Sequence, residues 1–154
     1  MGRIEGYKQA LADQQMTPLP GYIVSSGNSG DERGDLAGYE ATMKLLEGKS
    51  RPDGIFCFND PIALGTMRAI LDSGLRIPDD IAVVGCGNLL YSDFLRIPLS
   101  TVDQNSQLLG DRAAKLALAL ATQKGAARHK SELIHPHLVV RSSSLRSKNP
   151  AKKN

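Results

Sequence analysis

Tryptophan is absent from the 154 residues of this sequence, and aromatic residues as a whole make up only 5% of it. Cysteine is also scarce. Cys57 and Cys86 both lie in apolar segments, which favours buried free thiols over a disulfide framework. No apolar run approaches the roughly 20 residues that a membrane-spanning helix needs, and the first residues lack the apolar core of a signal peptide. These absences predict a cytoplasmic protein without membrane contact.

Acidic residues are missing from the segment after Glu132, and this segment accounts for the net charge. The chain carries a formal net charge of +3, and the segment alone holds five cations, which are Arg141, Arg146, Lys148, Lys152 and Lys153. Without these cations the rest of the chain is slightly negative. We therefore interpret residues 145–154 as a basic, disordered tail in preference to an arm that binds DNA.

The motifs of the common enzyme classes are incomplete. Gly48-Lys49-Ser50 follows a predicted helix and lacks the glycine that a phosphate-binding loop carries five positions earlier. Gly85-Cys86-Gly87 lacks the third glycine of a dinucleotide-binding fingerprint. His135 and His137 could bind zinc together with His129, although two histidines in one strand are more often structural. No nucleophile elbow or carboxylate pair occurs, so we expect no catalytic residue, no metal and no cofactor.

Apolar periodicity predicts alternating helices and strands. Helices are expected at residues 3–15, 36–46, 61–73 and 104–122, and strands at 22–24, 54–58, 81–84, 100–102 and 137–140.

The clearest unit of this pattern lies at residues 54–84. Residues 54–58 and 81–84 are continuously apolar, which is typical of strands buried on both faces of a parallel sheet. A helix with Asn59 or Asp60 as its cap and Pro61 in its first turn joins them. The pattern predicts an α/β fold, a three-layer sandwich with a mostly parallel sheet and a right-handed crossover.

Short polar side chains follow both of these strands. Asn59 and Asp60 come after the first strand, and Asn88 follows Gly87 after the second. Ligands of open α/β sheets bind beyond the carboxyl ends of the strands, where such side chains can meet hydroxyls, amides or amines. Since Asn59 or Asp60 could equally serve as a helix cap, spacing alone leaves both roles open.

Two stretches, residues 59–65 (NDPIALG) and 74–85 (GLRIPDDIAVVG), closely resemble the LacI/GalR family of bacterial transcription regulators. Further family-like segments follow the same order along the chain: 3–7 (RIEGY), 38–39 (GY), 98–104 (PLSTVDQ), 109–110 (LG) and 135–141 (HPHLVVR). The resemblance covers residues 3–144 and depends on the combination of these motifs. It implies a two-lobed core of the periplasmic-binding-protein-like type I fold, which in the family follows a helix-turn-helix.

The resemblance implies that a small effector binds between the lobes and changes the affinity of a homodimer for its operator. Together with the strand ends, it assigns six residues to the effector site, which are Arg3, Arg33, Asn59, Asp60, Asn88 and Gln104. It also implies a dimer interface whose apolar contacts are Met67, Leu71, Tyr91, Phe94 and Leu95.

Two departures from the family pattern concern the effector. Relatives commonly carry an aspartate at the position of Gly87 and an aromatic residue at the position of Arg33. Glycine cannot bind ligand polar groups, and the arginine adds a cation. A plain sugar is therefore less favoured than an acidic or phosphorylated metabolite, and sugar derivatives and nucleobases stay open.

By the same resemblance, residues 1–144 form an incomplete effector-binding and dimerisation core. They would comprise part of the C-terminal lobe, with helix 104–122 packing on an absent N-terminal lobe. We expect operator DNA to be contacted only through a missing N-terminal domain. The main hypothesis is the ligand-sensing core of a repressor. The alternative is a periplasmic sugar-binding protein of a transport system, which shares the fold.

Overall fold

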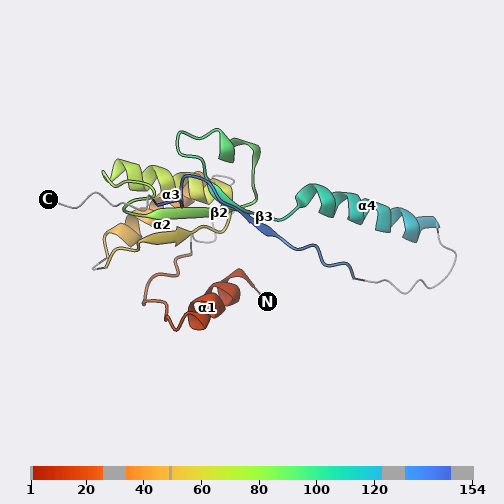
Figure 1. The fold of residues 1–154 in the computed structure, drawn as a ribbon, viewed down its shortest axis with the longest axis horizontal. Helices are drawn as coiled ribbons and strands as arrows, with labels where there is room; N and C mark the ends of the chain where they lie inside the picture. Colours follow the sequence, from red (N-terminus) through yellow and green to blue (C-terminus); the bar gives the residue numbers. More distant parts are fainter. Residues whose placement is uncertain (1, 26–33, 49, 123–130, 147–154) are drawn as a thin grey trace.

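Figure 1 shows the computed structural model, which describes residues 2–25, 34–48, 50–122 and 131–146. The helices are α1 (Arg3–Asp13), α2 (Gly34–Leu46), α3 (Asp60–Asp72) and α4 (Ser106–Thr122), with a short 3-10 helix, η1 (Leu90–Asp93). The strands are β1 (Gly54–Phe56), β2 (Ala82–Cys86), β3 (Ser100–Asp103) and β4 (His137–Val139). The four predicted helices therefore form, together with four of the five predicted strands.

The four strands form one sheet in the order β1-β2-β3-β4. β1 pairs with β2 in parallel, β2 pairs with β3 in parallel, and β3 pairs with β4 in antiparallel orientation. The predicted α/β fold with a mostly parallel sheet is confirmed, as is the parallel pairing of the first two buried segments.

The start of α3 follows from its local sequence. The side chain of Asn59 caps the helix, because its Oδ1 accepts a hydrogen bond from the backbone N–H of Ile62 at 2.9 Å. Pro61 occupies the first turn, where its missing N–H costs nothing. The helix ends before Gly74, whose φ of +72° favours glycine. Asn59, not Asp60, is therefore the cap.

The core lies between α3 and the sheet. Ile70 of α3, Ile81 and Val83 beside and within β2, and Leu99 are fully buried. α2 packs against α3 at a distance that only glycine permits: a side chain at Gly65 would collide with the backbone of α2. The two helices thus form one closely packed layer.

The β1 side of the sheet differs from the prediction. Phe56 is 45% exposed and Phe58 is 59% exposed, so the expectation that this strand is buried on both faces is wrong. β1 is the outer strand of the sheet, and the described chain places no packed element over that face. Residues 22–24 form no strand either, because they pair with no strand in the described part of the chain.

Two helices stand apart from the core. α1 and α4 contain no buried residue, and α4 projects away from the body (Figure 1). β3 leads out to α4, and the chain returns along residues 131–136 into β4. In the part of the chain that is described, no helix is both long and apolar enough to cross a membrane.

Candidate functional site

The candidate site lies at the edge of the sheet where three strands end. β1, β2 and β3 run parallel, so their carboxyl ends reach the same edge. Phe58 follows β1, Asn88 follows β2, and Asp103 is the last residue of β3. Arg3, at the start of α1, reaches this edge from outside the sheet.

Arg3 is held against the end of β1 by two contacts with Phe58. Its Nη1 donates a hydrogen bond to the backbone carbonyl of Phe58 at 3.0 Å. Its guanidinium lies 4.1 Å from the centroid of the Phe58 ring, which is a cation–π geometry. Both side chains are exposed, so a solute can reach the pair. Sequence reasoning missed Phe58, although an aromatic residue at a strand end beside Asn59 was a usable signal.

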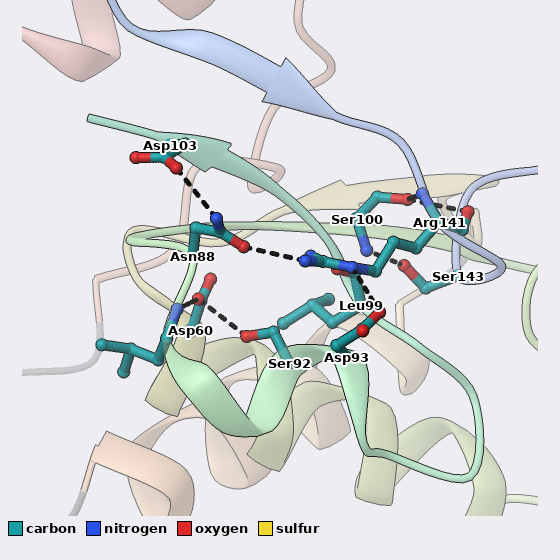
Figure 2. Close-up of polar contacts among 10 residues, drawn as sticks. Asp60, Asn88, Ser92, Asp93, Leu99, Ser100, Asp103, Arg141 and Ser143 are labelled. Atoms are coloured by element: carbon teal, nitrogen blue, oxygen red, sulfur yellow. Dashed lines mark hydrogen bonds and ion pairs between the residues drawn. The ribbon is translucent and has the colours of Figure 1, made fainter. Parts of the chain in front are cut away.

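Asp60 is fully buried, and its carboxylate joins three parts of the chain. It accepts hydrogen bonds from the backbone N–H of Leu89 at 2.8 Å and from Ser92 Oγ at 3.0 Å (Figure 2). It also accepts a hydrogen bond from Thr101 Oγ1 at 2.6 Å. The carboxylate thereby fastens the start of α3 to the η1 region and to β3. This is a structural role, and direct contact of Asp60 with an effector stays a prediction.

Asn88 is held between a cation and an anion. Its Oδ1 accepts a hydrogen bond from Arg141 Nη2 at 3.0 Å, and its Nδ2 donates to Asp103 Oδ2 at 2.9 Å (Figure 2). The backbone N–H of Asn105 donates to the other oxygen of Asp103 at 2.7 Å. The amide of Asn88, followed by this backbone N–H, keeps the pKa of the Asp103 carboxyl below its ordinary value.

The other predicted effector residues make fewer hydrogen bonds to the rest of the site. Asn59 is half-buried and serves as the cap of α3. Gln104 follows Asp103, is exposed, and its Nε2 lies 3.3 Å from Cys86 Sγ. Arg33 lies outside the described residues. The structure thus brings Arg3 and Asn59 to the end of β1, and Asn88 and Gln104 to the ends of β2 and β3.

The predicted dimer residues differ in how much of each side chain is exposed. Phe94 is 78% exposed and Leu71 is about half exposed, while Tyr91 and Leu95 are half-buried. Met67 is only 5% exposed and belongs to the core, so it offers almost no surface to a partner. Leu90 of η1, which sequence reasoning did not single out, is 85% exposed.

Metal and thiol chemistry add little to this site. Among the described residues, no group of histidine, cysteine and acidic side chains is arranged to hold a metal ion. Cys57 and Cys86 are buried and free, as predicted. Burial raises the pKa of the Cys57 thiol to about 11, so it stays protonated and unreactive at neutral pH.

Comparison with known proteins identifies related folds and sequences. The family described as periplasmic binding protein-like domain matches residues 2–144. The HTH-type transcriptional repressor PurR of Mannheimia succiniciproducens is 36% identical over 141 residues, which cover 92% of this chain and 40% of the relative. The repressor of the same name from Vibrio atlanticus is 35% identical with the same coverage. The chain therefore spans less than half the length of these curated relatives.

Two solved structures have a similar fold. A LacI-type transcription regulator from Bifidobacterium animalis subsp. lactis superposes with a TM-score of 0.80 at 29% identity, over 94% of this chain and 50% of that one. The Lac repressor bound to ONPG in the repressed state gives a TM-score of 0.77 at 30% identity, over 92% and 40%. The resemblance noted from the sequence motifs is thus confirmed by both kinds of comparison.

Proposed function

This chain belongs to the periplasmic binding protein-like domain family, and from this membership we propose that it is part of the effector-binding core of a LacI-type repressor. The observation that carries the proposal is the cluster of polar side chains at the carboxyl edge of the sheet, in a chain 36% identical to a repressor. No enzymatic activity is proposed. The longer protein would be cytoplasmic and would bind operator DNA through a domain outside these residues.

The effector would bind against Arg3, Phe58 and Asn88. Arg3 supplies a cation, the Phe58 ring supplies an apolar face, and Asn88 supplies an amide. Gly87, with a φ of +133°, adopts a conformation that favours glycine and adds no acidic group. These features favour a small effector with an acidic group and a flat or apolar face, such as an acidic metabolite, a nucleobase or a sugar derivative, over a plain sugar.

Three features support an incomplete lobe. Among the described residues no strand pairs with the outer edge of β1, and a cavity of about 380 Å³ lies between this edge, α1 and residues 22–25. α1 and α4 each lack buried residues although both carry apolar side chains. Such surfaces are normally covered in a folded protein, so we infer that the rest of the core packs on them. Residues 145–154 would form a basic tail.

The exposed apolar side chains around η1 support a homodimer. Leu90 of η1 and the adjacent Phe94 are exposed, and Leu71 in the last turn of α3 is about half exposed. A two-fold interface buries the same surface of both copies, so exposed apolar side chains of this kind would be covered twice in a homodimer.

The coding sequence upstream of Met1 gives the first test of this proposal. A helix-turn-helix there supports the regulator. An export signal there would instead favour the periplasmic sugar-binding protein.

The second test uses the longer protein and labelled operator DNA. Release or recruitment of the DNA is followed by fluorescence anisotropy with acidic metabolites, nucleobases and sugars in turn. Arg3→Ala should weaken the response roughly tenfold to a hundredfold, because one charged hydrogen bond is lost, while binding of DNA without effector is retained. Lys8→Ala, on an exposed position of the same helix, is the matched control. Equal responses in both variants would contradict the site.

A further inference from the structure

We propose that Arg141 is a positioning residue of the effector site, which fixes the side chain of Asn88 and, through Asn88, the residues where the chain leaves the body for α4. Its meaning for regulation rests on the proposed function, because Asn88 matters to an effector only if the effector binds at this edge. The geometry itself does not depend on that proposal.

Arg141 is held in one orientation by three acceptors from different segments. Its Nη1 donates to the backbone carbonyl of Leu99 at 2.8 Å, its Nε donates to Asp93 Oδ1 at 3.0 Å, and its Nη2 donates to Asn88 Oδ1 at 3.0 Å (Figure 2). The side chain is only 16% exposed. Because a guanidinium is planar and its donors point in fixed directions, the first two contacts determine where the third donor lies.

The amide of Asn88 consequently has one orientation. Arg141 can only donate and an ionised Asp103 can only accept, so the oxygen of the amide must face Arg141 and its nitrogen must face Asp103. The backbone of Asn88 is also constrained, with a φ of +49° and a backbone N–H that donates to Thr101 Oγ1 at 3.2 Å. One N–H and one lone pair of the amide remain for a ligand.

The same hydrogen bonds continue to the segments that connect the body to α4. Asp103 accepts from the backbone N–H of Asn105, and Asn105 Nδ2 donates to the carbonyl of His135 at 2.8 Å. Asn105 precedes α4 and His135 precedes β4, so this bond joins the outgoing and returning segments (Figure 1).

At its other end, the network reaches the η1 surface. Asp93 is the last residue of η1, its side chain is 66% exposed, and it lies next to the exposed Phe94. Two contacts, with Asp93 and with Leu99, orient Arg141. A partner that binds at η1, outside the effector site, and displaces Asp93 would remove the first of them. Binding at η1 and the position of Asn88 are therefore coupled through Arg141.

The test uses the 154-residue chain and nuclear magnetic resonance. Arg141→Lys keeps the charge but cannot make the three directed contacts. We expect the side-chain amide signals of Asn88 to shift, its amide protons to exchange faster, and the pKa of Asp103 to rise, because the amide of Asn88 no longer donates steadily to that carboxylate. His137 and Arg141 are the charged or titratable groups that also act on Asp103, and this substitution leaves both charges in place.

Arg146→Lys is the matched control. Arg146 lies in the same C-terminal segment and donates to the carbonyl of Pro78 at 3.1 Å, remote from Asn88 in the network. It should leave the Asn88 signals and the pKa of Asp103 unchanged. Identical spectra at Asn88 for both variants would overturn the proposal, whatever the outcome of the effector experiments.

A double-mutant cycle separates positioning from general loosening. Asn88→Gly removes the amide, and glycine tolerates the positive φ. If Arg141 acts through Asn88, Arg141→Lys should no longer change the pKa of Asp103 in the Asn88→Gly background. An undiminished change there would show that Asn88 is not the intermediary. If Arg141→Lys does not fold, Asp93→Ala tests the same network from its exposed end, and unchanged Asn88 signals in that variant would equally overturn the proposal.

Discussion

The two lateral sides of the sheet, called here the β1 end and the β3–β4 end, differ in how many buried contacts this chain makes there. At the β3–β4 end, Ser100, Thr101 and Ser143 are fully buried and hydrogen-bonded, and Arg141 closes the network over them. At the β1 end, Phe58 is exposed, no described strand pairs with the outer edge of β1, and α1 has no buried residue. The two site residues Asn88 and Arg3 differ in the same way in how firmly their side chains are held. Asn88 is fixed by contacts within the chain, while the polar and cation–π contacts of Arg3 with other described residues are those with Phe58.

The difference between the two sides of the sheet explains why the proposed site combines rigid side chains with mobile ones. Polar groups that are buried must be paired, so the β3–β4 end tolerates little movement. Exposed pairs such as Arg3 and Phe58 can part without leaving a buried donor unsatisfied. An effector would therefore be met by a preset amide on one side and an adjustable cation on the other.

Removal of the Asp60 carboxylate should have the largest effect. Asp60→Ala leaves the buried hydroxyls of Ser92 and Thr101, and the part-buried N–H of Leu89, without their acceptor, and should cost about 3 kcal/mol or more in the free energy of unfolding. Urea denaturation measures this loss. Asp72→Ala, at the exposed end of the same helix, should change it by about 0.5 kcal/mol or less. Similar losses in the two variants would mean that Asp60 does not anchor the packed end.

A pair of glycine substitutions compares the packed layer with α4. Gly65→Ala should destabilise the protein by about 1–3 kcal/mol, because its new Cβ meets the backbone of Asp35 across the α2–α3 contact. Gly110→Ala, in the interior of α4 with no atom near its Cβ, should instead raise helicity, with a gain of about 1 kcal/mol or less. Thermal unfolding followed by circular dichroism distinguishes the two. A stabilising Gly65→Ala would show that the helices separate in solution.

Loss of the Phe58 ring should have a small effect on stability and a local effect on α1. Phe58→Ala removes a cation–π contact worth about 0.5–1 kcal/mol at an exposed site. Hydrogen exchange should accelerate in α1 and stay unchanged in β3. Phe94→Ala, which alters an exposed ring outside this contact, is the control. Unchanged exchange in α1 after Phe58→Ala would show that other contacts hold the helix.

Acid titration should give the smallest effect. The pKa of Asp103 is lower in the folded state, so its contribution to stability is present above its unfolded pKa of about 3.9 and is lost as the pH falls through the folded value. Asp103→Asn should therefore flatten the decline in stability below about pH 4. Asp13→Asn, on α1 outside this network, is the control for loss of one carboxylate. Parallel pH profiles for Asp103→Asn and the unmodified chain would contradict the assignment.

The sequence anticipated part of the site and missed part of it for physical reasons. Asn88 and Asn59 could be placed because residues that follow a buried strand must lie at its carboxyl end. The role of Asp60 could not be separated from that of Asn59, because neighbouring polar residues before a helix look alike until their partners are known. Arg141 entered as one cation of the basic segment and as part of a family-like segment, and not as a site residue, since the amide that it orients lies 53 positions away.

The positions of the helices, of most strands and of the family-like motifs were determined by the sequence itself, because apolar spacing, caps and breakers act within one or two turns of chain. Tertiary structure alone decided that one face of β1 is open, that residues 22–24 remain unpaired and that Asp60 and Arg141 anchor the other end of the sheet. An apolar run looks the same whether or not a neighbouring strand or helix is present to cover it. Burial and hydrogen-bond partners depend on segments distant in the chain, and no local pattern records which of them will meet.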